Sequence, residues 1–202
     1  MPPQSFPSPS PDMQEDIERV LISQQRIAQR VRELAAQITA DHMPGAEGMT
    51  ADAEITLVPI LTGAMIFCAD LMRELSLKLR IGLLTVSSYP GASLRTQGSS
   101  LLGQQLGDVK GRHVLLIDDI LDSGGTIKLV VPVLQSMGPA SVKVCVLLRK
   151  DRPVAKEVFA DYVGFEIPDE FVVGYGLDYD DYYRNLPDIV TLKPSVYGGT
   201  GG

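Results

Sequence analysis

Val114-Leu-Leu-Ile-Asp-Asp-Ile-Leu-Asp-Ser-Gly-Gly-Thr126 is the stretch of this 202-residue sequence that decides the fold. Four aliphatic residues lead into two adjacent carboxylates, and a third carboxylate, Asp122, opens a turn of small residues before a helical pattern. This order predicts a buried strand that delivers acids to a helix N-terminus. The backbone N–H groups from Ser123 to Thr126 can converge on a phosphate there, and the helix dipole favours its negative charge.

The carboxylates of this segment indicate a sugar beside the phosphate. Asp118 and Asp119 can accept hydrogen bonds from sugar hydroxyls, while the hydroxyls of Ser123 and Thr126 add donors to the phosphate site. The alternative is a buried strand that ends in an ordinary polar turn. It is disfavoured because three aspartates within five residues at a strand end are costly without a ligand or metal.

Strand and helix patterns alternate along the rest of the chain. Residues 17–38 carry a helical pattern for which Ser23 is the expected N-cap, with a short strand at 19–22 before it. Further strands are expected at 55–61, 80–88, 112–119 and 141–148. The helix after the first of these should carry Cys68, Met72, Leu75 and Leu79 on one face.

The segments after the second and third expected strands have their own features. Pro90 to Asp108 has little periodicity and is expected to be a long surface loop. Residues 127–134 have the pattern of a helix, with Pro132 expected to kink or loosen it. Such alternation predicts an α/β fold with a parallel sheet and right-handed crossovers, whose ligands sit at the carboxyl ends of the strands.

The composition is that of a single globular domain. Hydrophobic residues make up 45% of the chain and charged residues 21%, and no apolar run approaches a membrane-spanning length. A net charge of −7 and a pI near 4.8 argue against nucleic acid as a main partner. The two cysteines, Cys68 and Cys145, lie in apolar surroundings and are expected to be reduced, which favours a cytoplasmic location.

The segment 114–126 resembles the phosphoribosyl pyrophosphate (PRPP) signature of the type I phosphoribosyltransferases. With the segment 163–187, the resemblance is to the hypoxanthine-guanine phosphoribosyltransferases in particular, and it extends from about Ile17 to Tyr197. It implies the type I phosphoribosyltransferase fold, an α/β fold with a central parallel sheet flanked by helices and a small hood subdomain. The domain would span 12–197, with its hood formed by the N-terminal segment and about 165–197. The tails 1–11 and 198–202 are expected to be disordered and flexible, respectively.

The resemblance also implies roles for residues around the purine. Asp122 would be the catalytic acid/base near the purine N7. Lys150 would donate a hydrogen bond to the 6-oxo group. Phe171 would stack on the ring, unless it is simply a core residue, and the backbone of Val172 would meet the exocyclic edge.

The remaining implied roles concern PRPP and its metal. The PRPP-binding residues would be Asp118, Asp119, Ser123, Gly124, Gly125 and Thr126. Thr62 and Gly63 would bind pyrophosphate in a loop that in the family can carry a cis non-proline peptide, and Arg184 would contact pyrophosphate from another part of the chain. Asp178 would coordinate Mg²⁺, with Asp118 and Asp119 contributing through ribose or water. Ser88 and Tyr89 would begin a lid loop over the site.

The function implied is that of a purine salvage enzyme. It would transfer the 5-phosphoribosyl group from PRPP to hypoxanthine or guanine, giving IMP or GMP and pyrophosphate. Two alternatives remain open: a PRPP-sensing regulatory protein on the same fold, and a phosphoribosyltransferase that prefers xanthine or another base. The expected assembly is a homodimer or homotetramer, with small-molecule substrates and neither nucleic acid nor membrane as a partner.

Overall fold

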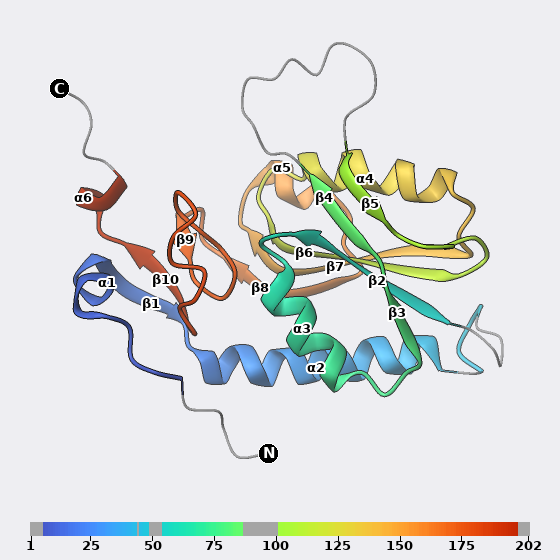
Figure 1. Cartoon of the computed structure of the whole chain (residues 1–202), viewed down its shortest axis with the longest axis horizontal. Helices are drawn as coiled ribbons and strands as arrows, with labels where there is room; N and C mark the ends of the chain where they lie inside the picture. The colour runs from blue at the N-terminus through green and yellow to red at the C-terminus, as the bar shows by residue number, and fades with distance from the viewer. Residues whose placement is uncertain (1–5, 44, 49–53, 87–100, 198–202) are drawn as a thin grey trace, which may run out of the picture.

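A mostly parallel sheet forms the centre of the molecule (Figure 1). The computed structural model describes residues 6–43, 45–48, 54–86 and 101–197. Within them the strand order is β5-β4-β2-β6-β7-β8, with β3 also paired to β2, and every pairing is parallel except that of β4 with β5. The strands are β2 (Ile55–Leu61), β3 (Leu79–Ile81), β4 (Leu83–Val86), β5 (Leu101–Gln105), β6 (His113–Leu121), β7 (Ser141–Lys150) and β8 (Tyr162–Ile167).

Helices cover both faces of this sheet, which confirms the expected α/β architecture (Figure 1). One face packs against α2 (Gln24–His42) and α3 (Met65–Glu74), and the other against α4 (Gly125–Ser136) and α5 (Pro153–Lys156). The signature strand β6 serves both faces, since Leu115 and Ile117 join the first core and Val114 and Leu116 the second. All four are completely buried, as an aliphatic run in a central parallel strand predicts.

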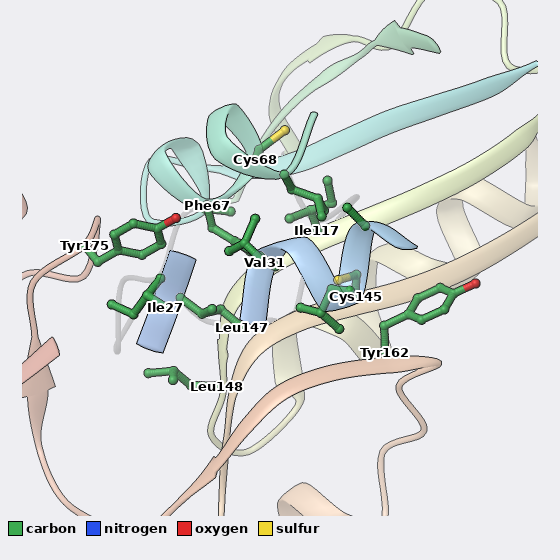
Figure 2. Packing of buried hydrophobic residues seen from close by; sticks show 14 of the residues in the cluster. Ile27, Val31, Phe67, Cys68, Ile117, Cys145, Leu147, Leu148, Tyr162 and Tyr175 are labelled. Atoms are coloured by element: carbon green, nitrogen blue, oxygen red, sulfur yellow. The ribbon is translucent and has the colours of Figure 1, made fainter. Parts of the chain in front are cut away.

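The first core is the larger of the two (Figure 2). Ile27 and Val31 of α2 and Phe67 of α3 pack there with residues of β6 and β7. Cys68 and Cys145 are both buried in this core as free thiols, as expected. None of the helices in the described part of the chain has the length and hydrophobicity needed to span a bilayer.

A second, antiparallel sheet lies in the part of the chain expected to form the hood, the N-terminal segment and about 165–197, and this part is called the hood below. Its order is β1-β10-β9, built from β1 (Ile17–Ile22), β10 (Ile189–Leu192) and β9 (Val172–Val173). Ile17 lies opposite Leu192, so the two ends of the domain pair with each other. The short helices α1 (Pro11–Asp16) and α6 (Pro194–Tyr197) flank these strands. Figure 1 shows this sheet at the left of the molecule, between α1 and α6 and the central sheet.

Most predicted elements are present, with two corrections. The hydroxyl of Ser23 accepts from the backbone N–H of Arg26, so the N-cap of α2 is confirmed, as is the short strand before it. Helix α3 ends at Glu74, so Leu75 and Leu79 do not extend its apolar face, and Leu79 instead begins β3.

The second correction concerns 80–108. The single strand expected from residue 80 is two strands, β3 and β4, separated by Gly82 and paired with successive parts of β2. Residues 101–105, expected within a loop, form β5 because they add an antiparallel edge to β4. Pro132 lies inside α4, which continues past it to Ser136.

Candidate active site

Two adjacent carboxylates, buried Asp118 and half-buried Asp119, lie near the carboxyl end of β6. Asp118 is only 6% exposed, and its Oδ1 accepts a hydrogen bond from the backbone N–H of Asp119 at 3.1 Å. The carboxylate of Asp119 accepts from the N–H of Ile120 at 2.8 Å. Burial raises the pKa of both aspartates, and the charge of Asp119 raises the pKa of Asp118 further. The pair therefore holds a proton more readily than isolated aspartates do.

The turn after β6 exposes backbone N–H groups at the start of α4. Gly124 is the N-cap residue, with φ of 75°, and a Cβ there would lie 2.3 Å from Val158 Cγ2. Only glycine satisfies both the left-handed backbone and the close approach. The N–H of Lys128 bonds the carbonyl of Gly124 at 2.9 Å, so the N–H groups just before it have no intrahelical acceptor. This is the arrangement that binds phosphate at helix N-termini.

The loop after β2 reaches the same carboxylates. The peptide bond between Leu61 and Thr62 is cis. Gly63 lies against Asp119 so closely that a Cβ would stand 1.8 Å from Asp119 Oδ2. On the other side, a Cβ on Gly176, whose φ is 104°, would stand 2.3 Å from the carbonyl oxygen of Gly63. Three segments distant in sequence therefore meet around Gly63: the backbone near Gly176 and the side chain of Asp119 both approach it.

Arg184 is held by residues of its own segment, close enough to β6 for its charge to act on Asp119. Its guanidinium donates to the carbonyl of Gly176 at 2.8 Å and contacts Asp178 Oδ1 at 2.8 Å and Asp181 Oδ1 at 3.2 Å. Its charge also acts on Asp119, where it opposes the rise in pKa that burial causes. The structure thus brings together the residue predicted to bind metal, Asp178, and the one predicted to bind pyrophosphate.

Four alternating charges form a closed ring beside the turn. Lys150 Nζ lies 3.3 Å from Asp122 Oδ2 and 3.4 Å from Asp169 Oδ1. Arg152 contacts the other oxygen of Asp122 through Nη1, and its Nε lies 3.4 Å from Asp169 Oδ2. Partial burial raises the pKa of Asp122, but the hydrogen bond from Arg152 and the charge of Lys150 outweigh this, so the pKa lies below its usual value.

Two members of this ring, Arg152 and Asp169, were not predicted from the sequence. Each reads as a solvated surface charge, since neither lies in an apolar pattern. The available signal was their spacing, because Arg152 follows Lys150 by two residues and Asp169 precedes Phe171 by two.

Phe171 presents a partly open aromatic face. Its side chain is 41% exposed, so it is not a core residue. Its ring packs against Tyr179 and Tyr197, with centroids 5.6 Å and 5.5 Å away. The next residue, Val172, is buried in β9. Ser88 and Tyr89, predicted to begin a lid loop, lie outside the described residues.

Tyr175 ties the hood to α3. Its ring is buried, and its hydroxyl donates to Asp70 Oδ2 at 2.7 Å. We expect Tyr175→Phe to lower the free energy of unfolding by about 1 kcal/mol, since the fold loses one hydrogen bond to a partly solvated carboxylate. Urea denaturation measures this change. Tyr182→Phe, at a ring that is 69% exposed, is the matched control, and equal stability of the two variants would contradict the tie.

Comparisons with known proteins agree on one family. The model of the phosphoribosyl transferase domain matches residues 20–180. A hypoxanthine-guanine phosphoribosyltransferase of Bacillus subtilis is 39% identical over 185 residues, which are 92% of this chain and 98% of that protein. One from Mycobacterium tuberculosis is 41% identical over 183 residues, covering 90% and 89%. The solved structure of a hypoxanthine phosphoribosyltransferase from Staphylococcus aureus is 38% identical, with a TM-score of 0.79 and coverage of 94% and 99%.

Proposed function

The chain belongs to the phosphoribosyltransferase family, and on this premise we propose that it is a purine salvage enzyme acting on PRPP and hypoxanthine or guanine. The products are IMP or GMP and pyrophosphate. The observation that carries this proposal is the placement of Asp122 and Lys150 next to the phosphate-binding turn, with Asp169 joining them to the segment of Phe171. A cation, a carboxylate and an aromatic face match the 6-oxo group, N7 and ring face of a 6-oxopurine.

The purine side of the site has three tasks. Phe171 stacks on the base, and the backbone of Val172 meets its exocyclic edge. Lys150 donates to the 6-oxo group. Asp122 takes a proton from N7 as the glycosidic bond forms, and returns it in the reverse reaction. The lowered pKa of Asp122 supports this role, since a base must be ionised before it accepts the proton.

The sugar-phosphate side binds and orients PRPP. The N–H groups of the turn from Ser123 to Thr126, including those of Gly124 and Gly125, bind the 5-phosphate, with the α4 dipole adding to the attraction. Asp118 and Asp119 accept from the ribose hydroxyls. The backbone of Thr62 and Gly63, with Arg184, binds the diphosphate and stabilises the charge that develops as it leaves.

Asp178 is the residue we propose for holding Mg²⁺. Within the described residues no group of three metal-ligating side chains gathers. Mg²⁺ commonly uses one or two carboxylates together with substrate phosphates and water, so a single aspartate beside a diphosphate site fits it. When bound, the ion supplies positive charge to the diphosphate. Asp178 pairs with Arg184, the residue that we propose contacts the diphosphate.

We propose a cytoplasmic homodimer or homotetramer as the working form. The free, buried thiols of Cys68 and Cys145 support a reducing compartment. The assembly is suggested by the family resemblance, and light scattering coupled to size-exclusion chromatography measures it.

The test of the function is a panel of bases. The protein is incubated with PRPP, Mg²⁺ and one of hypoxanthine, guanine, xanthine, adenine or a pyrimidine, and pyrophosphate release is followed. We expect turnover with hypoxanthine and guanine. Turnover restricted to xanthine, adenine or a pyrimidine would replace the proposed substrate. PRPP binding without turnover of any base would favour the regulatory alternative.

A further inference from the structure

We propose that Arg152 is a positioning residue, which holds the Asp122 carboxylate in place while Lys150 turns toward the base. The inference rests on the proposed function, because it assigns a partner to the acid/base group of that reaction. Arg152 precedes α5 in an extended conformation, with φ of −125° and ψ of 140°. Its guanidinium reaches Asp122 from the side opposite to Lys150 in the charge ring, contacting Oδ1 while Lys150 contacts Oδ2.

The ring gives every charge two partners. Asp122 and Asp169 each receive both cations, and Lys150 and Arg152 each contact both carboxylates. The Lys150 contacts, at 3.3 and 3.4 Å, are long for charge-assisted hydrogen bonds. Its ammonium is therefore loosely held and can turn toward a closer acceptor, such as the 6-oxo group of the base. A planar guanidinium with several fixed donors is better suited than an ammonium to bridge two carboxylates at once.

Arg152 matters most when the base arrives. The Lys150 side chain is only 11% exposed, so its movement toward a 6-oxo group takes its charge away from Asp122 and Asp169. The side chains of Asp122 and Asp169 are 43% and 50% exposed, so a carboxylate left without a partner becomes costly once the base covers it. With Arg152 still hydrogen-bonded to Asp122 and 3.4 Å from Asp169, neither carboxylate becomes unpaired. Asp122 also keeps its orientation toward the site that N7 occupies.

The charges that face Asp122 predict how removal of Arg152 changes its ionisation. Lys150 approaches from the end of β7 and Arg152 from the start of α5, while Asp169, from the turn before β9, faces both cations. The hydrogen bond from Arg152 is one of the causes that lower the pKa of Asp122. Its loss raises that pKa, so the ionised base disappears at a higher pH.

The experiment compares wild type, Arg152→Gln and Arg152→Lys in kcat/KM for the base as a function of pH. We expect Arg152→Gln to lower kcat/KM about tenfold, as for loss of one charge-assisted hydrogen bond, and to move the acid limb to higher pH. The KM for PRPP should stay unchanged. Arg152→Lys should restore part of the shift. Lys156→Gln, which removes a cation of α5 that pairs with Asp151 instead, should match wild type.

A second readout separates this inference from the proposed function. The ¹³C carboxyl resonance of Asp122, identified by its absence in Asp122→Asn, is titrated in the free protein. It should titrate at higher pH in Arg152→Gln and at lower pH in Asp169→Asn, because loss of Asp169 leaves both cations to Asp122. An inactive wild type would overturn the function while this titration still tests Arg152. Unchanged titrations, or an acid limb that does not move in Arg152→Gln, would overturn the inference. If Arg152→Gln does not fold, Asp169→Asn and Arg152→Lys decide it.

Discussion

Asp122→Asn lowers kcat for IMP formation by about 10²–10⁴-fold, the contribution expected of a positioned general acid/base. The amide has nearly the same shape and can still accept from Arg152, but it cannot take the purine proton. The KM for PRPP should change little, because Asp122 lies on the purine side of the turn. Steady-state kinetics with hypoxanthine as the varied substrate measure the loss.

Asp151→Asn is the matched control for this variant. It removes a carboxylate that follows the neighbouring strand β7 and pairs with Lys156 outside the charge ring. It should retain wild-type kcat. Near-wild-type turnover by Asp122→Asn would remove Asp122 from the acid/base role and direct attention to substrate-assisted proton transfer.

Gly63→Ala should have the second large effect. The new Cβ would stand 1.8 Å from Asp119 Oδ2, so the carboxylate must rotate away. Asp119 lies in the buried end of β6 and holds the N–H of Ile120, so this movement disturbs the ribose and diphosphate contacts together. We expect kcat/KM for PRPP to fall about 10²-fold, as for a displacement of about 1 Å at a reacting centre. The free energy of unfolding should fall by about 1–3 kcal/mol.

A substitution at Gly111 is the control that separates the loss of kcat/KM from the loss of stability. Gly111 has φ of 70°, and a Cβ there would meet nothing within 4 Å. Gly111→Ala should therefore cost about 1–2 kcal/mol of stability through its left-handed backbone alone and leave kcat/KM unchanged. If Gly63→Ala matched Gly111→Ala in both measurements, contact with Asp119 would have no part in PRPP binding.

Local chemistry explains which parts of the molecule were predictable from the sequence. Four aliphatic residues followed by acids specify a buried strand and its carboxyl end, and β6 is formed as predicted. Ser23 before an apolar repeat specifies the start of a helix, and its hydroxyl caps α2. The burial of Cys68 and Cys145 as free thiols was predictable from their apolar neighbours in the sequence. In each case the deciding interaction is local or depends only on burial.

The parts that were missed depend on distant partners. Leu79 continues the helical spacing of α3, but pairing with Ile55 of β2 places it in β3. The strand β5 exists because β4 offers an edge, which no periodicity in 101–105 reveals. Arg152 and Asp169 come together only in the folded protein, and their spacing from Lys150 and Phe171 does not by itself reveal that they pair.

The pairing of β1 with β10 sets an order of events on the ribosome. Strand β1 leaves the ribosome early in synthesis. Its partner β10 is synthesised only near the end of the chain, after every strand of the central sheet. Nascent chains fold from the N-terminal side as they emerge. The central sheet and its phosphate-binding turn can therefore form while the hood is still open. A nascent chain that stops before Ile189 already has the signature strand β6. It lacks the strand that pairs with β1 and with β9, which follows Phe171.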